Sequence, residues 1–161
     1  MPGDIDEDDS EGAKARGRII HTLSEVLPGV VPADRARIAQ TLMARHADRN
    51  LVADAASLID EVLALLADPD LAAIFEDGLP EVDITATLPE LRDSRIHGAI
   101  DRLLVTKTEV LAVDLKSNRV VPDRVEQVPL GLRRQMAAYR GALTQIYPDR
   151  AVGTALLWTR T

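Results

Sequence analysis

The chain has 161 residues, of which 46% are hydrophobic, and this is enough to build one domain with a buried core. Cysteine is absent, which excludes disulfides, thiolate zinc sites and cysteine-ligated iron–sulfur clusters, so any metal must bind to oxygen or imidazole. No run of about 18 apolar residues occurs and the N-terminus is acidic, so we expect a cytoplasmic chain without a membrane segment or a signal peptide.

The net charge of −7 conceals an uneven distribution. Residues 1–11 contain six acids and no base, whereas residues 92–140 contain ten bases and six acids. We therefore expect residues 1–13 to form an acidic disordered arm or linker, and residues 14–161 to form a single domain. That domain is expected to have a helical part and a sheet core, over residues 14–76 and 80–161 respectively.

The first half of the chain has the apolar spacing of amphipathic helices. Ile19, Ile20 and Leu23 fall on one helical face, and a Pro-Gly pair ends this helix, which is predicted over residues 14–27. His21 lies beside the apolar stripe, and periodicity alone indicates a solvent-facing histidine. Similar patterns predict three further helices, over residues 32–47, 51–67 and 69–75.

Beyond residue 80 the spacing changes to the alternation typical of strands. The strands are predicted over residues 81–88, 95–105, 109–116 and 151–158. A helix is predicted over residues 127–146, so the last strand must return to the sheet through a crossover. The expected fold class is α/β, with a mixed sheet made of a three-stranded meander, a crossover helix and a fourth strand, preceded by the helical part.

Two of these strands carry charges in runs that are otherwise apolar enough to be buried. A two-residue turn at Lys107-Thr108 would place Asp101 opposite Asp114, with Lys116 on the same face. The opposite face is expected to pack on the core, through Ile100, Leu104, Leu111, Val113 and Leu115.

Two facing carboxylates repel one another, and their burial is unfavourable unless they are paired or bind a cation. Mg²⁺ binds one or two carboxylates and the phosphate oxygens of a substrate, so the pattern favours metal-assisted phosphodiester hydrolysis with Lys116 beside the scissile phosphate. The structural alternative is a surface ion pair between Asp114 and Lys116, with Asp101 paired to Arg102 or Arg119.

Four motifs of this chain resemble those of the RecB-like branch of the PD-(D/E)xK nucleases, and most closely the C-terminal nuclease domain of AddA-type helicase–nucleases. They are Gly17-Arg-Ile-Ile-His21, Gly98-Ala-Ile-Asp-Arg102, Val113-Asp-Leu-Lys-Ser-Asn-Arg119 and Gln135-Met-Ala-Ala-Tyr139. Each motif is weak by itself, but the four occur in the family's order. The resemblance implies a restriction-endonuclease-like fold over about residues 15 to 160.

The resemblance also implies a set of site residues. The metal ligands would be His21, Asp101, Asp114 and the backbone carbonyl of Leu115, with Lys116 as the catalytic lysine. Gln135, Tyr139, Arg102 and Arg119 would line the site or contact DNA, although Tyr139 also fits the apolar stripe of its helix. One departure is Leu115-Lys116-Ser117, where relatives commonly have Tyr-Lys-Thr, but this change leaves the ligands in place.

Together these features predict a Mg²⁺- or Mn²⁺-dependent DNA exonuclease domain of a helicase–nuclease that acts in double-strand-break repair. Its expected partners are a single-stranded DNA end, the helicase part of the parent chain and an AddB-type subunit. Its expected location is the nucleoid region of the cytoplasm. No phosphate-binding loop of the Walker type occurs. The alternatives are a nuclease-fold module that binds DNA ends or a partner without cutting, and a purely helical regulatory domain.

Overall fold

The computed structural model describes residues 11–117 and 121–159 of the chain. The expected disordered arm therefore lies largely outside the described residues, as does Arg119. The chain forms two compact units. Of the described residues, the first unit comprises 11–76, 115–117, 121 and 158–159, and the second comprises 77–114 and 122–157.

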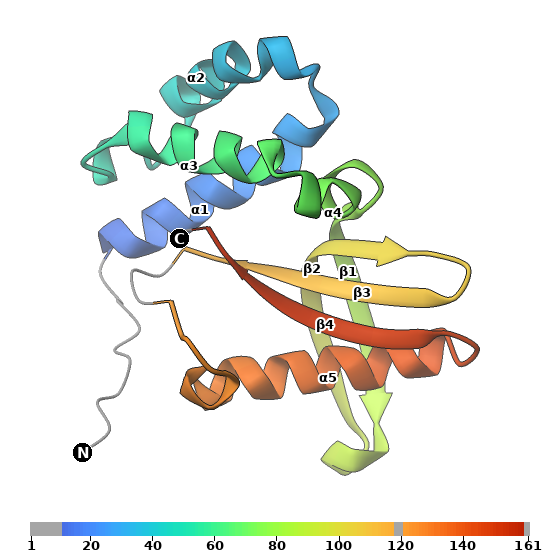
Figure 1. Cartoon of the computed structure of the whole chain (residues 1–161). Helices are drawn as coiled ribbons and strands as arrows, with labels where there is room; N and C mark the ends of the chain where they lie inside the picture. The colour runs from blue at the N-terminus through green and yellow to red at the C-terminus, as the bar shows by residue number, and fades with distance from the viewer. Residues whose placement is uncertain (1–10, 118–120, 160–161) are drawn as a thin grey trace. The chain divides into compact units, whose positions relative to one another are not determined.

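The first unit is built on four helices (Figure 1): α1 (Glu11–Val26), α2 (Arg35–Arg45), α3 (Ala55–Ala67) and α4 (Ala72–Glu76). Its core contains Ile19, Ile20 and Leu23 of α1 against Leu58 and Val62 of α3. All four predicted helices are present. The helix α1 begins three residues earlier than expected, because an acidic residue in the first turn favours the helix N-terminus.

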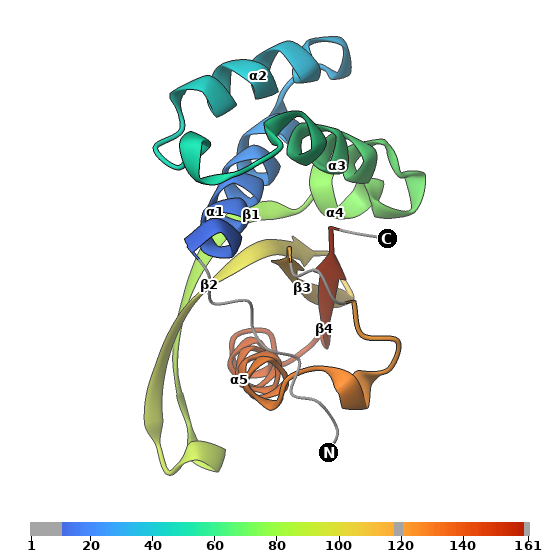
Figure 2. The ribbon, with the colours of Figure 1, turned by 90° about the vertical axis from the view of Figure 1, so that its left-hand side faces the viewer.

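The second unit is a sheet packed on one long helix. Its elements are β1 (Leu79–Leu88), β2 (Ser94–Val105), β3 (Glu109–Lys116), α5 (Leu130–Ile146) and β4 (Ala151–Trp158), of which the last two residues of β3 and the last residue of β4 belong to the first unit. The strand order is β1-β2-β3-β4. The helix α5, which is seen nearly end-on in Figure 2, lies along the concave side of the sheet. The first three strands are antiparallel. Backbone hydrogen bonds from Ala151 to Thr108 and from Thr159 to Lys116 show that β4 runs parallel to β3. The predicted mixed sheet is confirmed.

The pairing of β2 with β3 follows the predicted register. Val105 pairs with Val110, and Leu103 pairs with Ala112. The ladder ends at the pair formed by Arg102 and Val113, one position before Asp101 and Asp114, so the direct pairing of the two aspartates stays a prediction. The hairpin turn thus determines the register up to the residues next to the two aspartates.

The prediction of which face of β3 packs on the core was incomplete. The core beneath α5 contains Leu103, Val110 and Ala112, which share the face of Asp114. Val113 and Leu115 on the other face are also buried. Because β3 has a neighbouring strand on each side and both faces are covered, alternation alone did not distinguish a core face from a site face.

A break in the alternation of β2 occurs at the first aspartate. Ile100 and Leu103 both pack in the core beneath α5, although residues three positions apart point to opposite faces of a regular strand. The four residues from Ile100 to Leu103 are all buried. In β1 the residue between the paired positions Pro80 and Val82 is Glu81, whose φ of 48° lies in the left-handed region. Two carboxylates therefore occupy the irregular part of the β1–β2 pair.

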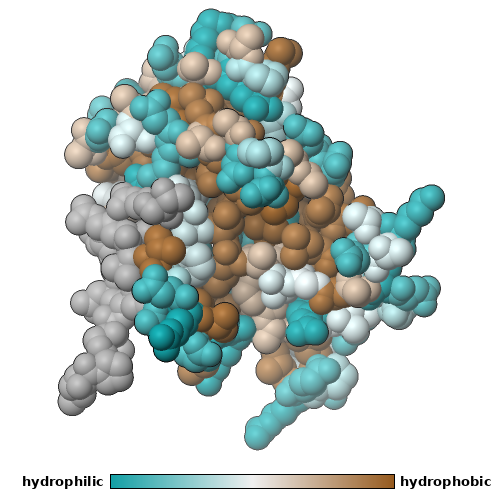
Figure 3. Space-filling view, viewed as in Figure 1, coloured by the Kyte–Doolittle hydropathy of each residue, from teal (hydrophilic) through white to brown (hydrophobic). Residues whose placement is uncertain are grey.

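The strands β1 and β4 form the edges of the described sheet. Residues 152–158 of β4 are all half-buried, and Figure 3 shows hydrophobic surface around β3 and β4 with hydrophilic side chains at the periphery. Among the described residues, no helix is long and apolar enough to cross a membrane.

Candidate active site

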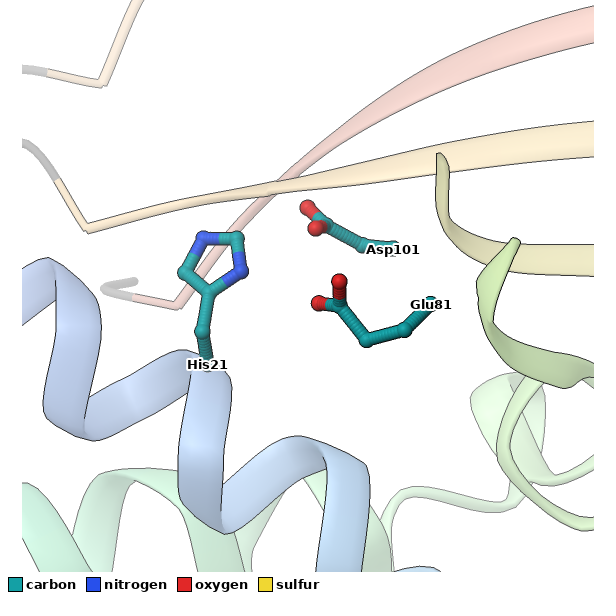
Figure 4. A group of neighbouring side chains, drawn as sticks. All are labelled: His21, Glu81 and Asp101. Carbon is teal, nitrogen blue, oxygen red and sulfur yellow. The ribbon is translucent and has the colours of Figure 1, made fainter. Parts of the chain in front are cut away.

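The irregular segment of β1 and β2 brings two carboxylates together. Glu81 and Asp101 each offer a carboxylate oxygen within 4.8 Å of the other, and Figure 4 shows the two side chains extending in the same direction. Asp101 is only 8% exposed, whereas Glu81 is open to solvent. Two negative charges at this separation repel each other strongly, so the pair is suited to binding a cation between them.

Asp114 on β3 is a second buried aspartate of the second unit. Its side chain is buried, like that of Asp101. Burial raises the pKa of the Tyr139 hydroxyl, and the charges of Asp114 and Asp101 raise it further, whereas the hydrogen bond from Gln135 lowers it. Both carboxylates therefore lie near enough to the phenol to act on its ionisation.

The helix α5 supplies a polar chain that ends beside these aspartates. The amide Nε2 of Gln135 donates to the Tyr139 hydroxyl, at 3.0 Å, and that hydroxyl donates to the carbonyl oxygen of Ala99, at 3.3 Å. Ala99 precedes Asp101 by two residues in β2. Gln135 and Tyr139 are thus linked to the β2 backbone two residues before Asp101, and their role in lining the site stays a prediction. Tyr139 is also part of the core, as its apolar spacing indicated.

Arg102 has a structural partner in the second unit. Its side chain is buried, and Nη1 donates to the carbonyl oxygen of Gly78, at 3.1 Å. Because a buried guanidinium is stable only where its donors are satisfied, this contact ties the start of β1 to the centre of β2. A role of Arg102 in binding DNA stays a prediction, and Arg119 lies outside the described residues.

The remaining predicted residues belong to the first unit. Leu115 is buried and Lys116 is half-buried at the end of β3, and Gly17 of α1 lies against the following residue, Ser117. His21 (Figure 4) is one helical turn beyond Gly17 on the same side of α1, because residues four apart share a helix face. It lines a groove of about 710 Å³ together with Lys14, Arg18, Thr22 and residues 46–48. The roles of His21, Leu115 and Lys116 stay predictions.

The donor set of the second unit fits a hard divalent cation. Glu81 and Asp101 offer neighbouring carboxylate oxygens, and Asp114 is a further buried carboxylate of this unit. Oxygen ligands are those that Mg²⁺ and Mn²⁺ prefer, and the sequence contains no thiolate that would favour a softer metal. Asp101 and Asp114 are buried, so a cation would also offset the unfavourable desolvation of their charges.

Sequence reasoning missed Glu81. The alternation of β1 indicated a solvent-facing residue of an exposed strand face, like Asp83 and Thr85. The information that would have identified Glu81 is the pairing of β1 with β2, in which Pro80 lies opposite Arg102 and Val82 opposite Ile100. This register depends on the loop of residues 89–93, whose sequence does not specify a turn of known length.

The mixed sheet and its buried carboxylates define an α/β protein with a candidate site for a divalent cation. The sequence model of the PD-(D/E)XK nuclease superfamily matches residues 3–160. The chain belongs to that superfamily, and its sheet with helices is the restriction-endonuclease-like fold that we expected. Members of the superfamily are generally nucleases and typically use divalent metals. No curated protein sequence matches the chain.

Proposed function

We propose that the chain is a divalent-metal-dependent DNA nuclease whose metal is bound by Asp101, Asp114 and Glu81. The observation that carries the proposal is that a carboxylate oxygen of buried Asp101 lies within 4.8 Å of one of Glu81. The ladder between β2 and β3 ends next to Asp101 on one strand and next to Asp114 on the other. These carboxylates would be poorly explained as surface ion pairs, because both aspartates are more than nine-tenths buried and lie on interior strands.

His21 and the carbonyl of Leu115 complete the proposed ligand set. Their support is the resemblance of Gly17-Arg-Ile-Ile-His21 and Val113-Asp-Leu-Lys to the family's motifs. Within the first unit, the contact of Gly17 with Ser117 supports this assignment, because it brings the face of α1 that carries His21 to the end of β3.

Each residue has a distinct part in the proposed reaction. The metal, when bound, supplies Lewis-acid polarisation of the phosphodiester and a lowered pKa for the attacking water. The carboxylates hold their negative charge at a fixed place in the sheet, so no reorganisation is needed when the substrate arrives. Lys116 places a cation where negative charge develops on the scissile phosphate, and Gln135 with Tyr139 bounds the site on the α5 side.

The finer assignment is an exonuclease within a helicase–nuclease of the AddA type that acts in double-strand-break repair. We propose Mg²⁺ or Mn²⁺ as the metal, a single-stranded DNA end as the substrate, and the helicase part and an AddB-type subunit as partners. The support is the order of the four motifs along the chain. A circular single strand tests the exonuclease assignment, because it has no end and should survive while a linear strand of the same sequence is degraded.

Two measurements on the purified chain test the nuclease assignment. Calorimetric titration with Mn²⁺ should show a site in the wild-type chain whose affinity falls at least about 10-fold in Asp101→Asn and Asp114→Asn. Cleavage of an end-labelled single strand should require metal and should fall about 10²- to 10³-fold in Lys116→Met. The control is Lys107→Met, at the exposed hairpin turn.

The rival function is a nuclease-fold module that binds DNA ends or a partner without cutting. It predicts that the Asn variants do not alter Mn²⁺ binding and that no metal restores cleavage. Loss of metal binding in both Asn variants, together with cleavage that depends on Lys116, would exclude the rival.

A further inference from the structure

Four hydrogen bonds form a closed ring at the end of β3 in the first unit. Arg16 Nε donates to the carbonyl oxygen of Ser117, at 3.2 Å, and its Nη2 donates to Glu61 in an ion pair. The same oxygen of Glu61 accepts a hydrogen bond from the Thr159 hydroxyl, at 2.8 Å. The Thr159 amide donates to the carbonyl oxygen of Lys116, at 2.9 Å, which closes the ring.

This ring joins three elements to the strand end that carries Lys116. Arg16 comes from α1, Glu61 from α3, and Thr159 directly follows β4. The side chains of Arg16 and Glu61 are 15% and 17% exposed, and Thr159 is 4% exposed. Partial burial strengthens an ion pair and its hydrogen bonds relative to a solvent-exposed pair, so the ring can hold a defined geometry.

The end of β3 needs such support because the ladder with β2 ends before it. The last pair of that ladder is Arg102 with Val113, and Lys116 lies three residues further on. The ring fixes the carbonyl groups of two consecutive residues. The Thr159 amide binds the carbonyl of Lys116, and Arg16 binds the carbonyl of Ser117. The peptide plane that holds the first of these carbonyls also contains the Lys116 Cα atom, and the second carbonyl lies in the next plane, beyond Ser117. The ring therefore fixes the backbone dihedral angles of Ser117 and anchors the main chain at the atom from which the Lys116 side chain leaves the strand.

We propose that Arg16, Glu61 and Thr159 are positioning residues that orient Lys116 for the cleavage reaction. This inference rests on the proposed function, and none of the three residues is assigned a contact with the substrate. A misplacement of about 1 Å in a catalytic group can reduce a rate by about 100-fold, so a ring that holds the backbone of Lys116 has a measurable effect on catalysis.

The sharpest test is Thr159→Val, which removes the hydroxyl and keeps the shape of the side chain. The matched control is Thr159→Ser, which keeps the hydroxyl. We expect kcat for a single-stranded oligonucleotide to fall about 10- to 100-fold in Thr159→Val and in Glu61→Gln. KM and the calorimetric affinity for Mn²⁺ should stay at their wild-type values, because the carboxylates of the second unit are unchanged.

A second readout does not depend on activity. The amide at position 159 donates to Lys116, so its hydrogen exchange should become about tenfold faster when the ring is opened by Glu61→Gln. Arg37→Gln, on an exposed ion pair of α2, should leave both exchange and kcat unchanged. Arg16→Met would open the ring at both hydrogen bonds of Arg16. If that variant does not fold, the comparison of Thr159→Val with Thr159→Ser still decides the question.

The outcomes separate this inference from the nuclease assignment. Wild-type kcat and wild-type exchange in Thr159→Val and Glu61→Gln, with Lys116→Met inactive, would overturn the positioning role and leave the nuclease assignment intact. A parallel fall of Mn²⁺ affinity and kcat would also overturn it, because the ring would then act on the whole fold. Faster exchange with an unchanged fold, but no metal-dependent cleavage by any variant, would reject the nuclease assignment and with it the positioning role.

Discussion

The aromatic side chain of Tyr139 lies directly against the backbone of Gly98, so that a Cβ atom added at Gly98 would be 2.5 Å from the Tyr139 hydroxyl oxygen. The same hydroxyl donates to the carbonyl of Ala99. The glycine of one motif and the tyrosine of another are therefore two halves of a single packing contact, which sets the distance between α5 and β2.

We expect Gly98→Ala to lower the free energy of unfolding by about 1–3 kcal/mol, because the methyl group would overlap a buried aromatic ring that cannot move away. Thermal denaturation measures the effect. Gly17→Ala is the contrasting control, since its Cβ would lie at an ordinary 3.5 Å from Ser117 Oγ. In a helix interior this change should raise stability by about 0.5–1 kcal/mol. Equal effects at both glycines would contradict the packing argument.

The raised pKa of Tyr139 predicts a loss of stability at alkaline pH. Above its ordinary value of 10.0, the unfolded chain loses the phenol proton while the folded chain keeps it. The stabilisation is therefore complete below pH 10.0 and disappears as the pH rises through the folded-state pKa. Tyr139→Phe should flatten this part of the stability profile, and a wild-type slope in that variant would show that another group is responsible.

The same phenol reports on the aspartates. The chain has two tyrosines, so Tyr147→Phe leaves only Tyr139 to titrate by phenolate absorbance. In that background Asp101→Asn and Asp114→Asn should each lower the Tyr139 pKa, because each removes a negative charge that opposes ionisation of the phenol. Unchanged midpoints in both variants would place the carboxylates too far from Tyr139 for the proposed site.

Glu81 should contribute to metal affinity although it lies on an exposed part of β1. We expect Glu81→Gln to weaken Mn²⁺ binding about 10-fold in calorimetry, because it removes one charge from the carboxylate pair with Asp101. Asp83→Asn is the matched control, because Asp83 lies two residues along the same strand and is also exposed. The assignment of Glu81 fails if both variants bind Mn²⁺ like the wild-type chain.

Arg102 should act on stability more than on DNA affinity. Arg102→Gln removes the hydrogen bond to the Gly78 carbonyl within a buried environment, and we expect the free energy of unfolding to fall by about 1–3 kcal/mol. Arg95→Gln, on the exposed part of β2, should stay within about 0.5 kcal/mol of the wild type. A large drop in DNA affinity for Arg102→Gln, measured below its melting temperature, would instead support the predicted DNA contact.

Much of the fold could be predicted because local patterns and loop lengths agree. The two-residue turn at Lys107-Thr108 allows one register, and that register brings Asp101 toward Asp114 without any tertiary information. Helix spacing also predicted α1, α3 and α5 to within a few residues. Periodicity was less useful for β3, because a strand with both faces buried carries no alternation that identifies the site face.

The sequence by itself determined the elements, the hairpin register and the four motifs, since each depends on residues that are close along the chain. Tertiary structure decided which distant residues meet: Glu81 with Asp101, Gly98 with Tyr139, and Arg16 with Ser117. These contacts depend on a left-handed residue in β1, on the close approach of α5 to β2, and on helices packed at the end of β3. No local pattern encodes such contacts, because they form only when the separate elements pack together.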